Sequence, residues 1–151
     1  MTYLILKFLH VTAASAWMGG LLAVTLLDAR MLRAGDPHTL GTLAEQGGRL
    51  RRAVIGPSAG LTLIAGGLAS YVAGIGWPLW IDWGLAAIVL SIVLGATIGR
   101  RIVADLSRVT AMAEQGDARI TALRRRLLRF DAVMILIVVS TVWMMVVKPT
   151  L

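Results

Sequence analysis

His10 is the residue of this sequence best suited to chemistry, because it lies inside an apolar run near the N-terminus. A polar side chain there is costly unless it faces the interior of a helix bundle, where an imidazole can bind a metal or haem iron or transfer protons. Helical spacing places Lys7, His10, Ala14 and Trp17 on one face. This face predicts a cofactor site formed by His10 and Trp17. The alternative is a structural histidine hydrogen-bonded to a neighbouring helix, and the sequence leaves both open.

If His10 binds haem iron, the opposite ligand is another residue of the chain, a residue of a second protomer, or absent. His38 follows His10 by about 28 residues, or about 40 Å along a helix, so the two cannot bind one haem within a protomer. We expect His38 to be a solvated loop residue. Met144 and Met145 are candidates at a suitable depth, because a thioether sulfur can bind haem iron. Ordinary apolar packing is the alternative for both methionines.

A polar cluster is expected where the apolar runs end, and it consists of Lys7, Asp82 and Lys148. Asp82 can pair with either lysine across the bundle. It can equally cap the N-terminus of the helix that it opens, beside Trp80 and Trp83, and we favour the cap. The neighbouring tryptophans are typical of an aromatic belt at a membrane surface.

Other catalytic motifs are absent from the sequence. It has no cysteine, which excludes disulfides and thiolate chemistry. It also lacks zinc-ligand spacing, a phosphate-binding loop, a nucleophile elbow and a pair of catalytic carboxylates, so hydrolysis and ATP-driven chemistry have no support. Whether the protein is an enzyme stays open. Asp131 is expected to pair with Arg100 or Arg101 rather than to relay protons.

Four long apolar segments must position these residues. They span approximately residues 3–27, 54–75, 79–98 and 127–147, and each approaches or exceeds the ~20 residues that a helix needs to cross ~30 Å of hydrocarbon. Apolar residues make up 58% of the 151 residues and charged residues 15%, which is more apolar surface than a soluble domain of this size can bury. We predict an all-α fold: a four-helix transmembrane bundle, one integral membrane domain (1–151), surrounded by membrane lipid.

The cations are distributed unevenly. Of the 15 Lys and Arg residues, 12 lie between the first and second or between the third and fourth apolar segments, and Arg129 lies at the start of the fourth, while Lys7 and Lys148 lie near the termini. By the positive-inside rule these two connections are cytoplasmic and both termini are outside. Stop and cap signals at 35–37 and 115–117 predict that the helices extend into the cytoplasm, to about Ala34 and Gln115, as two long hairpins. The cations flank apolar segments instead of covering one face, which argues against nucleic-acid binding.

Small residues recur at helical spacing in the second and third segments. They are Gly56, Gly60, Gly67 and Gly74 in the second, and Ala87, Ser91, Gly95 and Gly99 in the third. Such stripes favour close helix packing in lipid, within the chain or against a homo-oligomer or a larger membrane complex. Pro57 is expected to kink the second helix or to mark its first membrane turn.

The run from Leu6 to Val11, with Ala14, Trp17, Gly19 and Gly20, resembles the opening of a family of small, uncharacterised bacterial four-helix integral membrane proteins. The ending from Met144 to Pro149 resembles theirs too, so the likeness covers the whole chain. More weakly, the opening is similar to the membrane domain of CopD-type copper-resistance proteins and to the four-helix haem-dependent protoporphyrinogen oxidases. The likeness to the oxidases implies a haem role for His10. The bacterial family implies the inner (plasma) membrane.

Three functions agree with these observations. The first is binding of haem b or another porphyrin through His10 in a redox-related role, with the cofactor carrying the electrons. The second is a non-catalytic accessory subunit of a larger membrane complex. The third is transport of a small solute or of copper ions, with His10, Met144, Met145 and Asp82 lining an outward-facing site.

Overall fold

Four long helices make up the computed structural model, which describes residues 1–33, 37–112 and 118–148. The elements are α1 (Thr2–Arg33), α2 (Pro37–Leu50), the π-helical turn η1 (Arg51–Ile55), α3 (Gly56–Val72), α4 (Leu79–Leu94), the π-helical turn η2 (Gly95–Gly99), α5 (Arg100–Met112) and α6 (Ala118–Val147). The segments α2–η1–α3 and α4–η2–α5 are continuous helices. Four helices of the described part are long and apolar enough to cross a membrane. The predicted all-α fold is therefore confirmed, as are four long apolar helices.

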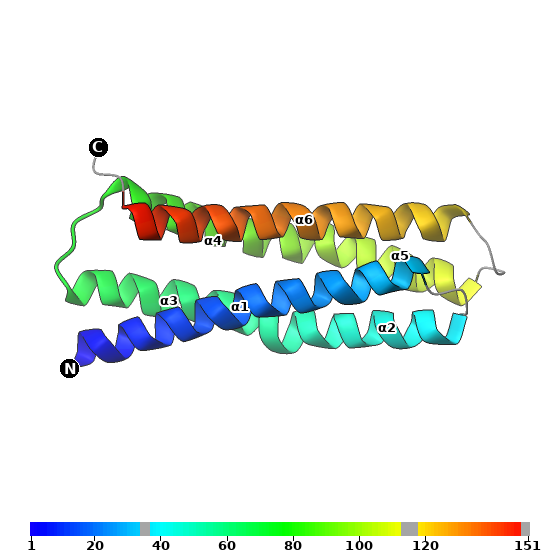
Figure 1. The fold of residues 1–151 in the computed structure, drawn as a ribbon, viewed down its shortest axis with the longest axis horizontal. Helices are drawn as coiled ribbons and strands as arrows, with labels where there is room; N and C mark the ends of the chain where they lie inside the picture. The colour runs from blue at the N-terminus through cyan, green and yellow to red at the C-terminus, as the bar shows by residue number, and fades with distance from the viewer. Residues whose placement is uncertain (34–36, 113–117, 149–151) are drawn as a thin grey trace.

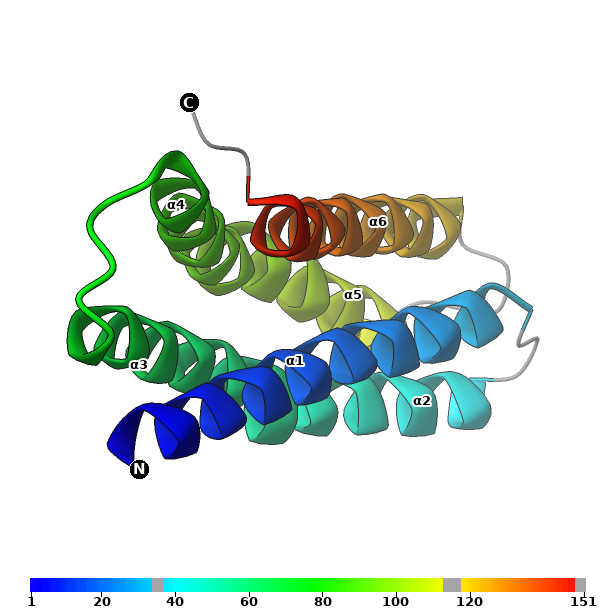
Figure 2. The ribbon, with the colours of Figure 1, turned by 60° about the vertical axis from the view of Figure 1, so that its left-hand side comes forward.

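The helices run roughly antiparallel in a single bundle (Figure 1). α1 packs against α2 and α3, α6 packs against α4 and α5, and α1 also contacts α6. α1 begins and α6 ends at the same end of the bundle, where residues 73–78 connect α3 to α4; we call this the terminal end. Among neighbouring helices α3 and α4 meet least, and Figure 2 shows them spread apart toward the terminal end.

The second membrane helix ends at Val72, earlier than the predicted residue 75. Gly74 has φ 62°, and the N–H groups of Gly74 and Ile75 donate to the carbonyls of Tyr71 and Ser70. These two bonds form a Schellman cap, which needs a residue in the left-handed conformation and so favours glycine. The glycine spacing predicts that Gly74 belongs to a packing stripe, but in the structure Gly74 ends the helix.

Large exposed apolar side chains cover one part of the bundle. On α1 they extend from Leu4 to Leu26, a rise of about 33 Å, which matches the thickness of a hydrocarbon layer. On α6 they begin only at Val133. The described parts of α2 and α5 carry none of them. The bundle therefore has a lipid-facing half at the terminal end and a half that extends beyond it, which holds most of the arginines. The expected end points Ala34 and Gln115 lie outside the described residues.

The interior contains two apolar cores in series. Trp17, Leu21, Ala59, Ile88, Met134 and Val138 form the first, and Met31, Leu40, Ile102, Leu106, Ile120 and Leu127 form the second. The first core lies in the lipid-facing half. The second closes the extension and explains why the helices stay together outside the apolar belt.

The predicted glycine stripe of the second helix is wrong as a packing surface within the chain. A methyl group on Gly60 or Gly67 would meet nothing within 4 Å, because these positions are not covered by another helix. The stripe of the third helix is confirmed in part: Ala87 and Ser91 are buried, and a methyl group on Gly99 would lie 3.1 Å from the Phe130 ring. Glycine spacing alone therefore does not predict which positions of these helices lie in close contact with another helix.

Pro57 lies in the first turn of α3, directly after η1. Proline has no N–H to donate, so an unbroken α-helical ladder cannot pass through it. The chain changes hydrogen-bond register before the proline, and the N–H of Gly56 donates to the carbonyl of Arg51, five residues earlier. A π-turn changes the rotation of the helix and therefore the directions of the side chains before and after it. Arg51, at the start of η1, points into the bundle.

Candidate functional site: the cavity around His10

His10 is fixed by one hydrogen bond to the neighbouring helix. Its Nδ1 lies 2.9 Å from the carbonyl oxygen of Thr62 on α3. A carbonyl oxygen can only accept, so Nδ1 carries the proton of the ring. In a neutral imidazole the lone pair is then on Nε2. This arrangement, with one ring nitrogen donating to a backbone carbonyl, is the one that metal-binding histidines generally adopt.

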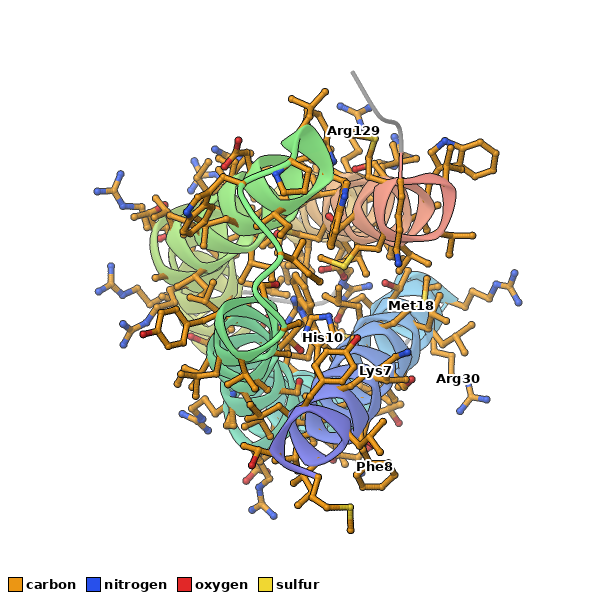
Figure 3. The ribbon with its side chains drawn as sticks, turned by 90° about the vertical axis from the view of Figure 1, so that its left-hand side faces the viewer. Lys7, Phe8, His10, Met18, Arg30 and Arg129 are labelled. Atoms are coloured by element: carbon orange, nitrogen blue, oxygen red, sulfur yellow. The ribbon has the colours of Figure 1, made fainter. Side chains whose placement is uncertain are left out.

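Gly66 provides the space for the imidazole. A methyl group at this position would lie 2.6 Å from Nδ1 and 2.7 Å from Cε1 of His10. Real side chains do not approach so closely, so only glycine is compatible with this ring position. The Nδ1–Cε1 edge of the ring therefore lies against α3, one turn from its Thr62 partner. Figure 3 shows His10 directed toward the centre of the bundle.

A cavity of about 840 Å³ surrounds His10 at the terminal end. Side chains from α1, α3, α4 and α6 line it, and the walls are mostly apolar and aromatic. Trp17, 2% exposed, lies two turns deeper than His10 and contributes to both the cavity and the first core. The volume is within the range of roughly 300–1,000 Å³ typical of small-molecule and cofactor sites.

The structure brings together five of the seven predicted site residues. Lys7, His10, Trp17, Met145 and Lys148 all line the cavity. Met144 and Asp82 are not among the lining residues. Met144 is excluded because it is one position, or about 100°, away from Met145 around α6. The side chain of His38 lies outside the described part of the structure.

Asp82 does not play the predicted role. The N-cap of α4 is Pro78, and Asp82 lies in the first turn, where its side chain is exposed. No ion pair joins it to Lys7 or Lys148 among the described residues. Lys148 instead lies over the ring of Trp80, with Nζ 5.5 Å from the ring centroid, a cation–π geometry. The predicted outer cluster is therefore a pair of lysines at the cavity, without the aspartate.

Sequence reasoning missed several residues of this site. Thr62 and Gly66 hold the imidazole, and Thr141 and Trp80 contribute to the walls. Gly66 belongs to a Gly66-Gly67 pair in α3. That pair was a usable signal, since adjacent glycines in a membrane helix are costly without a packing reason. The partner of Gly66 was not visible from the sequence.

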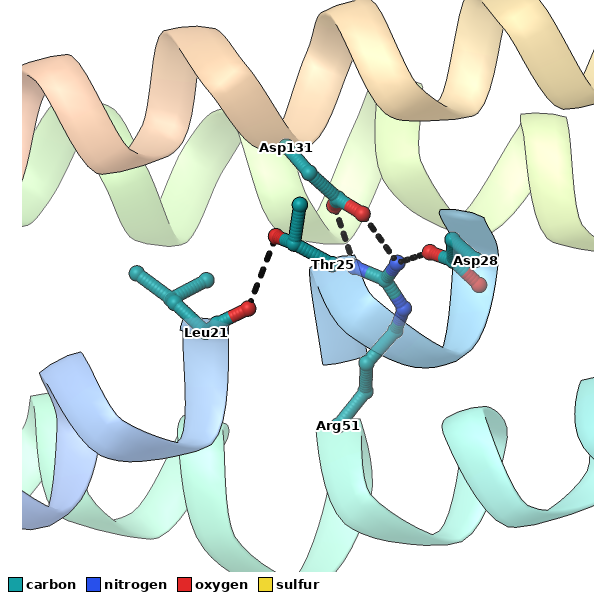
Figure 4. Close-up of polar contacts among 5 residues, drawn as sticks. All are labelled: Leu21, Thr25, Asp28, Arg51 and Asp131. Carbon is teal, nitrogen blue, oxygen red and sulfur yellow. Dashed lines mark hydrogen bonds and ion pairs between the residues drawn. The ribbon is translucent and has the colours of Figure 1, made fainter. Parts of the chain in front are cut away.

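A buried ion cluster joins Arg51 to Asp28 and Asp131 (Figure 4). Along α1 and α6 it lies between the first and the second core. Arg51 donates from Nη1 to Asp131 Oδ1 at 2.9 Å and from Nη2 to Asp131 Oδ2 at 3.0 Å. Nη2 also contacts Asp28 Oδ2 at 2.5 Å. Asp131 is fully buried and Asp28 is 3% exposed. The cluster joins α1, η1 and α6.

The expected pairing of Asp131 with Arg100 or Arg101 is wrong. Both arginines are exposed on the surface of the bundle. Asp131 instead faces the interior, where it accepts hydrogen bonds from Arg51. Two turns away on the same face of α6, Arg124 is also buried and donates from Nη1 to the carbonyl of Met31 at 2.7 Å. This bond satisfies a carbonyl in the last turn of α1. Buried cations thus occupy the interior in addition to the exposed ones.

Comparison with known families settles the relationship of the chain. Residues 4–149 match a family described as predicted integral membrane protein (DUF2269). The chain belongs to this family. Its membership confirms the predicted likeness to an uncharacterised integral membrane protein family, and the protein is a multi-pass integral membrane protein in contact with lipid. No curated protein and no solved structure matches the chain.

Proposed function

We propose that this protein binds an iron porphyrin, haem b, in the cavity at the terminal end, with Nε2 of His10 as an axial ligand. The observation that carries the proposal is the hydrogen bond from His10 Nδ1 to the Thr62 carbonyl beside a cavity of about 840 Å³. It holds the ring in the tautomer that leaves Nε2 available to a metal. The apolar and aromatic walls suit a flat, largely apolar macrocycle.

The surroundings of His10 favour a porphyrin over a bare metal ion. Nowhere in the described residues do three or more His, Cys, Asp or Glu side chains gather in a way that could hold an ion. A porphyrin supplies four nitrogen ligands itself, so the protein needs to contribute only one or two. His10 with Met145, which lines the same cavity, is a ligand pair known for haem iron. When bound, haem supplies one-electron redox chemistry.

We further propose that the protein lies in a bacterial inner membrane with both termini outside. The half of the bundle beyond the exposed apolar belt contains most of the 15 cations, and the positive-inside rule assigns such a half to the cytoplasm. The cavity then opens toward the outer face of the membrane. Helices α2 and α5 form the cytoplasmic extension.

Replacement of His10 by alanine tests the haem proposal. We expect wild-type protein purified in detergent from haem-replete cells to contain bound haem, and His10→Ala to lose at least 90% of it. Loss of an axial ligand without loss of fold should leave helix content and elution volume unchanged. The measurement is haem per polypeptide by extraction into alkaline pyridine.

His38→Ala is the matched control, because it removes the other histidine of the chain. It should bind haem like the wild type. A colourless wild-type preparation, or equal haem content in His10→Ala, would reject the proposal.

A second candidate, the accessory subunit of a membrane complex, is favoured by the uncovered glycines of α3. Gly60 and Gly67 leave the helix backbone accessible to a partner helix, as in closely packed membrane dimers. Solubilised gently, the native protein should then migrate in a larger assembly that Gly60→Leu disrupts. Migration of the wild type as a single chain would argue against it. The transporter hypothesis loses support, because Met144 and Asp82 are not in the cavity.

A further inference from the structure

The two lysines of the chain are both at the cavity of His10. Lys7 and Lys148 line it, while none of the arginines is among its described lining residues. The arginines therefore lie at other places in the molecule. A cavity with mostly apolar walls and two cationic groups is suited to a ligand with a matching negative charge.

The lysines are positioned above the imidazole, at the rim. Lys7 precedes His10 by one turn of α1, and Trp17 follows His10 by two turns, so the backbone positions of Lys7 and Trp17 are about 15 Å apart along the helix axis. Figure 3 shows Lys7 and His10 on the inner side of α1, with Phe8 directed away. Anionic groups at the rim would thus leave an apolar body beside His10 and Trp17.

Lys148 adopts an unusual backbone conformation. It has φ 45°, while the other described residue with positive φ is a glycine, and its N–H donates to the carbonyl of Met144. Non-glycine residues adopt this region rarely, at a cost of about 1 kcal/mol. The conformation ends α6 and accompanies the position of the ammonium group over Trp80. The lysine is held at the rim instead of following the helix axis into solvent.

The walls of the cavity are accessible from the lipid side. Several lining residues are also exposed on the outer surface of the apolar belt, among them Val11 at 53%, Leu85 at 43% and Val146 at 74%. α3 and α4, which contribute opposite walls, meet least of the neighbouring helices. These observations favour entry of a bilayer-dissolved ligand between α3 and α4.

We infer that the cavity takes a membrane-dissolved amphiphile with carboxylate groups, which pair with Lys7 and Lys148 at the rim while the apolar body lies beside Trp17. The inference rests on the proposed function in that it concerns the same cavity, and haem b, with two propionates, is one such ligand. It does not require iron. Metal-free porphyrins therefore separate carboxylate recognition from axial ligation by His10.

The test uses protoporphyrin IX, which has two carboxylates and no metal, and its uncharged dimethyl ester. Both are incorporated into phosphatidylcholine vesicles that contain the full-length protein, and binding is followed by quenching of tryptophan fluorescence. We expect the diacid to bind at least tenfold more tightly than the diester. In Lys7→Gln/Lys148→Asn the diacid should lose at least tenfold in affinity and the diester should be unchanged. Asparagine is chosen at 148 because it tolerates the positive φ.

Two further variants serve as controls. Arg125→Gln/Arg126→Gln removes the same charge at exposed positions of the other half, and it should bind both porphyrins like the wild type. Lys7→Arg/Lys148→Arg keeps the charge and should retain most of the preference for the diacid, which guards against a loss caused by misfolding.

Each outcome distinguishes this inference from the haem proposal. The inference is wrong if the diester binds as tightly as the diacid or if neither binds. It is also wrong if Arg125→Gln/Arg126→Gln loses as much affinity for the diacid as Lys7→Gln/Lys148→Asn. If the diacid binds in a lysine-dependent way while haem binding is unaffected by His10→Ala, the inference holds and the haem proposal fails.

Discussion

Asp131→Ala is expected to reduce the free energy of unfolding by about 3–5 kcal/mol, the usual cost of breaking a buried ion pair by removing one partner. The Arg51 guanidinium would lose two of its three contacts with carboxylates and would stay largely buried beside Asp28. Because domains are stable by only about 5–15 kcal/mol, a loss of this size should be visible as low yield and a lower melting temperature. The measurement is thermal unfolding of the purified protein in detergent.

The two aspartates of the ion cluster should differ in importance. Asp131 accepts two hydrogen bonds from Arg51 and Asp28 accepts one. Asp28→Asn keeps an acceptor oxygen and should cost about 1–2 kcal/mol, less than Asp131→Asn. Asp105→Ala, at an exposed position of α5, is the matched control and should unfold like the wild type. Equal melting temperatures for Asp131→Ala and Asp105→Ala would show that the cluster does not stabilise the fold.

Gly66→Ala is expected to weaken the proposed haem binding strongly while leaving the bundle folded. The added methyl group would overlap the imidazole at 2.6 Å from Nδ1, so the ring must rotate away and give up its bond to Thr62. We expect at least a tenfold loss of haem affinity, measured by titration of the purified protein with haemin. Melting temperature should change little, because alanine is a better helix former than glycine and offsets part of the strain.

Gly67→Ala provides the control at the adjacent position. A methyl group there would meet nothing within 4 Å, and the variant should bind haem like the wild type. Should both alanine variants bind equally well, the position of His10 against α3 would not matter for the cofactor. A loss in both would point to a general effect of alanine on α3.

The membrane helices could be predicted from the sequence because they depend on length and composition. Apolar runs near residues 3–27, 79–98 and 127–147 required no partner to be recognised, and each lies within a long helix. The position of His10 in the interior also followed, because the cost of burying a polar group in lipid is a property of that residue alone.

The pairings between helices could not be predicted, because they depend on the rotation of each helix about its axis. One residue of shift turns a side chain by about 100°. This is why Asp131 contacts Arg51 instead of Arg100, and why Met145 lines the cavity and Met144 does not. The π-turn η1, which changes the rotation of the helix just at Arg51, is invisible in residue spacing. The contact between Asp28 and Arg51 could not be predicted for the same reason.

Haem binding in this cavity is decided by an absorption spectrum of the detergent-purified protein reconstituted with haemin, recorded in the oxidised and then in the reduced form. We predict one haem per chain and a reduced spectrum with the narrow bands of axially ligated iron, present in His38→Ala and absent in His10→Ala. A spectrum identical to that of haemin in detergent alone, or one that His10→Ala leaves unchanged, would contradict the assignment of this cavity as a haem site.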